Sequence, residues 1–142
     1  MRPICRSILV QVIVPANTAR SAQIAFPDVK ELREQGTKVY GVESVAQAQL
    51  SIGTGLIDVV SAADADNIVF TLVERSTQRI QQVPFLSFNI VTTAGIYREV
   101  SAFQPDMQRS TIQFTATPAA TTFVVPFLFH YAYTIDPIYA YL

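Results

Sequence analysis

The stretch that decides the fold is residues 107–134, MQRSTIQFTATPAATTFVVPFLFHYAYT. It predicts a buried hairpin of two long β-strands, joined at the turn Thr117–Ala120. Polar and apolar residues alternate in the first strand, residues 107–117, with Ile112 and Phe114 directed inward. Such alternation is typical of a strand with one face in the core and one face in water.

The second strand of this stretch, residues 121–134, is apolar on both faces. One face can fill the core of a β-sandwich and carries Phe123, Val125, Phe127 and Phe129. The opposite face carries Val124, Leu128 and His130. That face needs a second cover, and a neighbouring subunit is the simplest supplier. We therefore predict Val124, Leu128 and His130 as interface residues.

The rest of the chain also reads as β-structure, with turn signals roughly every 8–12 residues, as expected of a sandwich or barrel. One short helix is predicted over Pro27–Gln35. Gly41 indicates a bulge or a close backbone approach, and Pro84 indicates an edge or a bulge. The further predicted strands are residues 7–14, 19–26, 37–51, 68–74, 79–91 and 96–103. The apolar, β-branched composition of residues 7–14 is typical of a buried strand. The sequence thus predicts an all-β protein, an eight-stranded jelly-roll-like β-sandwich with one short helix, in a single domain over residues 1–142. An immunoglobulin domain is disfavoured because the chain has no Trp and a single Cys.

Charge is scarce along the 142 residues. Hydrophobic residues make up 50% of the chain, charged residues 15%, and the net charge is −1, whereas an average domain is about 25% charged. Extensive contact with other proteins would account for this shortage of charge. The alternative is a thick sandwich whose surface is polar but uncharged. No basic run or stripe is present to neutralise phosphates, so we expect no direct nucleic-acid site.

The sequence offers few residues for catalysis or metal binding. His130 is the single histidine, and Cys5 is the single cysteine, so a zinc site is not indicated. We expect Cys5 to be a half-buried hydrophobic residue. A Ser-His-Asp triad needs only one histidine, but no G-x-S-x-G motif occurs and His130 lies in an apolar strand. Asp64-x-Asp66 fits an Asx-turn better than a calcium loop. We therefore expect no catalytic residues, no cofactor and no metal, and no enzyme.

Both ends of the chain are candidates for contact arms. The segments Met1–Arg6 and Pro137–Leu142 flank the predicted strands, and the second would otherwise be an apolar tail in water. We predict Tyr139, Tyr141 and Leu142 as interface residues, with folding of the tail onto its own sheet as the alternative. The apolar N-terminal stretch loosely resembles a signal peptide, but Gln11 interrupts it and a strand is the better interpretation.

One stretch carries a resemblance. Phe26-Pro27-Asp28-Val29 leads to Leu32-Arg33-Glu34 and then to Lys38-Val39-Tyr40-Gly41-Val42-Glu43. This pattern, over about 20 residues, resembles the opening of jelly-roll capsid proteins from tailless icosahedral phages, especially lipid-containing ones. The resemblance implies a virion structural protein. Major capsid proteins of that lineage usually carry two jelly rolls, and this chain has room for one, which points to a vertex (penton) protein or a single-roll capsid subunit.

The resemblance also implies partners. These are copies of the same chain in a ring, with a pentamer favoured, other capsid proteins, and proximity to an internal membrane, so the expected location is the virion. It supplies no catalytic residues. The competing hypothesis is a carbohydrate- or receptor-binding β-sandwich, such as a fibre or lectin-like domain, which is favoured by Tyr and Gln residues expected to be exposed near loops.

Overall fold

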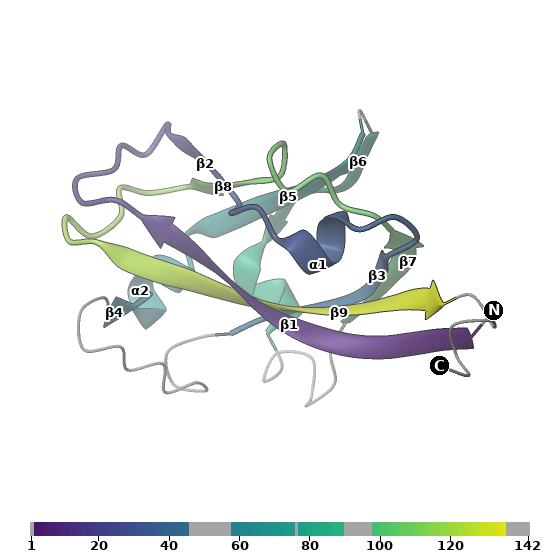
Figure 1. Cartoon of the computed structure of the whole chain (residues 1–142). Helices are drawn as coiled ribbons and strands as arrows, with labels where there is room; N and C mark the ends of the chain where they lie inside the picture. Colours follow the sequence, from purple (N-terminus) through teal and green to yellow (C-terminus); the bar gives the residue numbers. More distant parts are fainter. Residues whose placement is uncertain (1, 46–57, 76, 90–97, 136–142) are drawn as a thin grey trace.

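The computed structural model describes residues 2–45, 58–75, 77–89 and 98–135, which form two facing antiparallel sheets (Figure 1). The larger sheet has the order β1-β9-β3-β7, with β4 as a short parallel addition to β9. Its strands are β1 (Arg2–Val14), β9 (Phe123–Ile135), β3 (Lys38–Ser44), β7 (Arg98–Phe103) and β4 (Asp58–Val59). The smaller sheet has the order β2-β8-β5-β6. Its strands are β2 (Gln23–Ala25), β8 (Thr111–Phe114), β5 (Ile68–Glu74) and β6 (Thr77–Pro84).

The strand order follows from rolling up one long antiparallel ribbon. With β4 set aside, the first strand pairs with the last, β2 with β8, β3 with β7, and β5 with β6 at the closed end. Rolling this ribbon brings β9 beside β3 and β8 beside β5, and both of these pairings are present. Two four-stranded sheets built in this way are a jelly roll, so the predicted fold class is confirmed.

The predicted hairpin of residues 107–134 is wrong. The strand β8 covers only residues 111–114 and lies in the smaller sheet, paired with β2 and β5. The strand β9 lies in the larger sheet and pairs with β1 over all 13 residues, from Arg2 opposite Ile135 to Val14 opposite Phe123. The alternation of side chains fixes which face of each strand is buried, but any antiparallel partner satisfies that pattern. The choice of partner therefore could not be read from it.

The helical content is small, and one piece of it was predicted. The helix α1 (Lys30–Arg33) lies within the expected segment and buries Leu32. Two further single turns, α2 (Ala62–Ala65) and the 3₁₀ turn η1 (Phe85–Phe88), were not predicted because one turn is too short to show a helical period. The strand expected over residues 79–91 ends at Pro84, which cannot donate to the ladder. The bulge predicted at Gly41 is confirmed by a register shift in β3.

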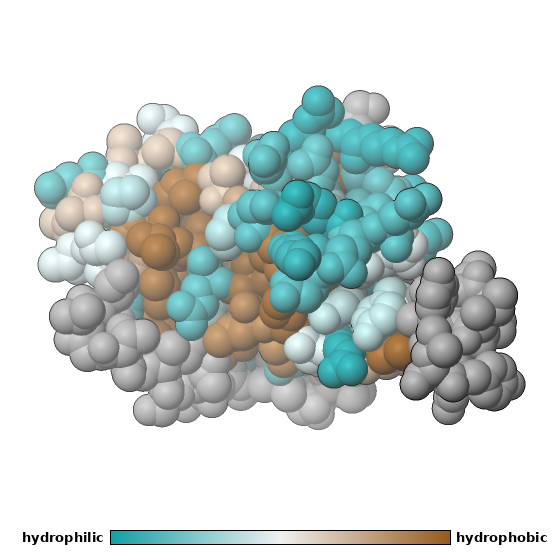
Figure 2. Space-filling view, in the orientation of Figure 1, coloured by the Kyte–Doolittle hydropathy of each residue, from teal (hydrophilic) through white to brown (hydrophobic). Residues whose placement is uncertain are grey.

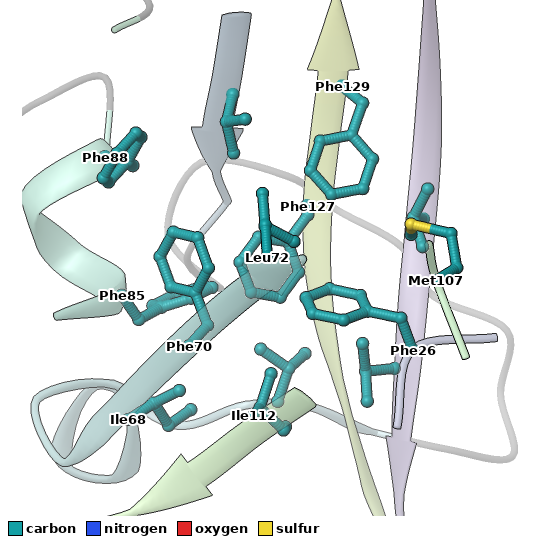
Figure 3. Packing of buried hydrophobic residues seen from close by; sticks show 14 of the residues in the cluster. Phe26, Ile68, Phe70, Leu72, Phe85, Phe88, Met107, Ile112, Phe127 and Phe129 are labelled. Carbon is teal, nitrogen blue, oxygen red and sulfur yellow. The ribbon is translucent and has the colours of Figure 1, made fainter. Parts of the chain in front are cut away.

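The core between the sheets is centred on the aromatic residues of β9 (Figure 3). Phe127 is fully buried, and its ring centroid lies 5.0 Å from that of Phe26, 5.1 Å from that of Phe70 and 5.1 Å from that of Phe85. Tilted and edge-on rings at such distances are the favoured aromatic geometry. The inward face predicted for β9 is confirmed, because its four phenylalanine and valine side chains are 0–3% exposed.

Candidate interaction surface

The described strands leave four sheet edges, and the edge formed by β1 differs from the other three. The edge strand β2 is only three residues long, and β6 is bent by two register shifts against β5. The edge strand β7 is six residues long, and its pairing with β3 shifts register between Val39 and Gly41. Short strands, bulges and charges are the usual means by which proteins prevent edge-to-edge pairing. By contrast, β1 runs for 13 residues without a register shift, and residues 7–14 contain no charge and no proline.

The orientation of the β1 backbone follows from its pairing with β9. The Pro126 carbonyl accepts a hydrogen bond from the Val45 N–H, on the side of β9 that faces away from β1. Gln11 lies opposite Pro126. In an antiparallel pair, two opposed residues either exchange their hydrogen bonds or both direct their backbone groups outward. The same outward direction holds for every second residue along β1, and from Cys5 onward these residues are Cys5, Ser7, Leu9, Gln11 and Ile13.

These five residues also share the outer face of the larger sheet, and we call them the β1 edge. Leu9 and Ile13 are 38% and 55% exposed, and they are the exposed large hydrophobic residues of the described chain. Figure 2 shows hydrophobic surface gathered along the course of β1, whereas the region over β6 is hydrophilic. None of the five residues carries a charge. The nearby Arg6 points to the other face of the sheet, where its hydrogen bond with the Tyr133 hydroxyl raises the pKa of the Arg6 guanidinium. Among the described strands, none pairs with the outward backbone groups of the β1 edge, and its side chains are uncharged and partly apolar.

The composition of residues 7–14 predicts a buried strand, and this expectation is wrong for one face. Val10, Val12 and Val14 are buried, but Leu9 and Ile13 are exposed. Cys5 is exposed as well, not half-buried. The apolar composition of β1 resembles that of a central strand, and only the strand order reveals that β1 lies at an edge.

The structure places three of the predicted interface residues on the outer face of β9, as expected from the alternation. Val124 is 5% exposed, Leu128 is half-buried, and the His130 side chain is 12% exposed. Val124 and His130 are thus largely covered within the single chain, and β9 lies between β1 and β3 and not at an edge. The larger exposed apolar area therefore lies one strand away, on β1. The predicted residues Tyr139, Tyr141 and Leu142 lie outside the described residues.

A chain of polar side chains crosses the outer face of the larger sheet. Ser7 Oγ of β1 lies 2.8 Å from His130 Nδ1 of β9, and His130 Nε2 lies 3.2 Å from Glu43 Oε2 of β3. The Tyr40 ring lies beside the imidazole, with the centroids 6.3 Å apart. Glu43 and His130 each keep 12% of the side chain exposed. These bonds satisfy two mostly buried polar groups and tie three neighbouring strands together.

The same three residue types form the triads of serine hydrolases, but the surroundings differ. In the hydrolase fold the nucleophile sits on a sharp turn beside backbone N–H donors that stabilise an oxyanion. Ser7 lies in the middle of a regular strand. The imidazole also presents Nδ1 to Ser7 and Nε2 to Glu43, the reverse of the template triad. The arrangement therefore fits a strand-linking role better than acyl transfer.

The outer face of the smaller sheet is hollowed. One hollow of about 580 Å³ is lined by Arg20, Ser21, Val69, Gln82, Gln113, Phe114 and Thr115. An adjoining hollow of about 150 Å³ shares Val69, Gln82 and Gln113 with it. The alternation of β2 and β8 directs their glutamines outward, and this could be read from the sequence. The gathering of glutamines from β2, β8 and β6 could not, because it depends on strand order.

The loop acid expected to form an Asx-turn is held within the fold. The Asp64 carboxylate accepts a hydrogen bond from the Ala119 N–H at 3.2 Å, and the Asp64 N–H donates to the Ser61 hydroxyl that caps α2. Within the described residues, no group of three or more His, Cys, Asp or Glu residues could hold a metal ion. In the same part of the chain, no helix has the length and apolar character needed to cross a membrane.

Comparison of the chain with family models, curated proteins and solved structures found no match. The surface that the structure does single out is the β1 edge.

Proposed function

We propose that this protein is a virion structural protein, a capsid or vertex (penton) subunit that assembles laterally with copies of itself. The observation that carries the proposal is the unprotected β1 edge, with outward backbone groups and the exposed side chains of Leu9 and Ile13. An exposed, long and apolar edge strand is a template for pairing with another chain. Such an edge has no role in a monomeric protein, whereas in a subunit it can form the contact with a neighbouring copy.

The charge distribution is consistent with this proposal. Interface cores are depleted in charged residues, and the β1 edge has none over five alternate positions. The resemblance of residues 26–43 to phage jelly-roll capsid proteins gives the kind of particle. A ring requires that the β1 edge of one copy meets a different surface of the next copy, because like-to-like pairing about a two-fold axis closes at a dimer. We favour a pentamer that joins other capsid proteins, close to an internal membrane.

The test is the mass of the purified protein, measured by size-exclusion chromatography with light scattering, together with electron micrographs. The native protein should form rings, and Leu9→Lys combined with Ile13→Lys should give monomers, because two charges would have to be buried at each contact. The control is Gln81→Lys, which adds a charge to an exposed position of the bulged strand β6 and should leave the rings intact.

Circular dichroism spectra of all three proteins should agree, since the changed side chains are exposed. A native protein that stays monomeric at high concentration would overturn the assembly role. A native dimer would contradict the ring while keeping the β1 edge as the contact.

A further inference from the structure

The outer face of the smaller sheet carries a concentration of uncharged hydrogen-bonding side chains, which we call the amide face. It is made up of Gln23, Thr71, Gln78, Gln82, Thr111 and Gln113. The strand registers bring them together. Gln113 of β8 lies opposite Gln23 of β2 on one side and Val69 of β5 on the other, and Thr111 lies opposite Thr71. Two joined hollows, of about 580 and 150 Å³, lie over this face.

The strand β6 is distorted where it borders the amide face. Its pairing with β5 shifts register twice, so that β6 carries one extra residue at each shift. Gln82 has φ = 45°, in the left-handed region that side chains rarely adopt, and its N–H donates to the Thr71 hydroxyl at 3.1 Å. Bulges and strained residues concentrate at functional sites, and they redirect the side chains that they carry. Here they direct Gln82 into both hollows.

The chemistry of the lining selects the class of ligand. We propose that the amide face binds a neutral oligosaccharide. A side-chain amide offers two N–H donors and a carbonyl acceptor, and a threonine hydroxyl offers one donor and an acceptor. A sugar hydroxyl is likewise both donor and acceptor, so each can be matched on a surface of amides and hydroxyls. The larger hollow lies within the range of roughly 300–1,000 Å³ that is typical of ligand sites.

Other ligand classes fit less well. None of the lining residues is acidic, which disfavours a cation. Two arginines lie in the lining, and the Arg109 side chain already faces the Asp106 carboxylate at 3.6 Å and donates to the Arg75 carbonyl. Arg20 alone is a weak basis for a polyanion. A protein partner would favour exposed aromatic side chains, and Phe114, the aromatic residue of the lining, is 2% exposed.

The experiment is a glycan array with the purified protein, followed by calorimetric titration of the strongest neutral binder. Gln23→Ala and Gln113→Ala should each weaken binding about tenfold, which corresponds to the loss of one or two well-formed hydrogen bonds. Gln81→Ala is the matched control, because Gln81 is exposed on the same sheet and lines neither hollow. Gln23 lies on a three-residue edge strand, so its truncation spares the fold even if Gln113→Ala does not.

The site is independent of the proposed assembly. The variant with Leu9→Lys and Ile13→Lys changes the opposite sheet and should bind the glycan as the native protein does. The inference is overturned if the array shows no binder, if only acidic glycans bind, or if Gln23→Ala and Gln81→Ala bind equally well.

Discussion

At the scale of single residues, the two faces of β9 can be compared through neighbouring side chains. Phe127 is fully buried among the rings of Phe26, Phe70 and Phe85, whereas Leu128 is half-buried on the outer face. Phe127→Ala should lower the free energy of unfolding by about 3–5 kcal/mol, because it leaves a cavity in the core. Urea denaturation measures this difference. The free energy of unfolding of Phe127→Leu should lie between those of the native protein and Phe127→Ala. This milder variant allows a measurement if Phe127→Ala does not fold.

The matched control for the core is Leu128→Ala, one residue along the same strand. This substitution should lower the free energy of unfolding of the isolated chain by only about 1 kcal/mol, because the Leu128 side chain is already partly exposed to solvent. Equal losses for Phe127→Ala and Leu128→Ala would contradict the assignment of the two faces.

A second residue-scale prediction concerns acid stability. The Glu74 carboxylate accepts hydrogen bonds from the Gln104 N–H at 2.9 Å and from the Arg79 guanidinium at 2.6 Å, and these bonds hold the pKa of Glu74 below its ordinary value. The charged form is therefore the one that stabilises the fold. Its contribution is present above the pKa of the unfolded chain and is lost as the pH falls through the lower pKa of the folded protein.

Thermal unfolding of the native protein and of Glu74→Gln between pH 7 and pH 3 tests this linkage. The native protein should be the more stable near neutral pH, and the difference should shrink as the pH falls. Glu31→Gln removes the same charge at an exposed position and reports the effect of net charge alone. A difference that stays constant over the whole range would show that the Glu74 carboxylate is not held in its charged form.

At the scale of elements, β1 offers a direct chemical test because Cys5 is the one cysteine of the chain and is exposed. Cys5 belongs to the β1 edge, so a bulky maleimide polymer attached to it would cover the proposed contact. Modification should convert the assembled protein to monomers in light scattering. Cys5→Ser treated with the same reagent should assemble normally. Modified protein that assembles as well as the untreated protein would exclude this part of β1 from the contact.

At the scale of the whole molecule, the sequence was sufficient to locate most of the strands, although the short strand β4 was not predicted, and it was insufficient to identify which strands are neighbours. The alternation at Ile112 and Phe114 correctly gave the buried face of β8, and Gly41 correctly marked a bulge, since both depend on local backbone geometry. The hairpin of residues 107–134 failed because partner choice depends on long-range packing. For the same reason the β1 edge and the amide face were missed, although every one of their residues was visible in the chain.

The rolled ribbon also has a consequence for synthesis. The first strand of the described domain, β1, pairs in the larger sheet with the last described strand, β9, and Arg2 lies opposite Ile135. The nascent chain therefore cannot pair β1 with β9 in its larger sheet until residues 123–135 have been synthesised. Such distant pairings fold slowly and leave strand edges exposed to other chains in the meantime. Until β9 has been synthesised, both edges of β1 lack a partner within this domain and are open to pairing with other chains.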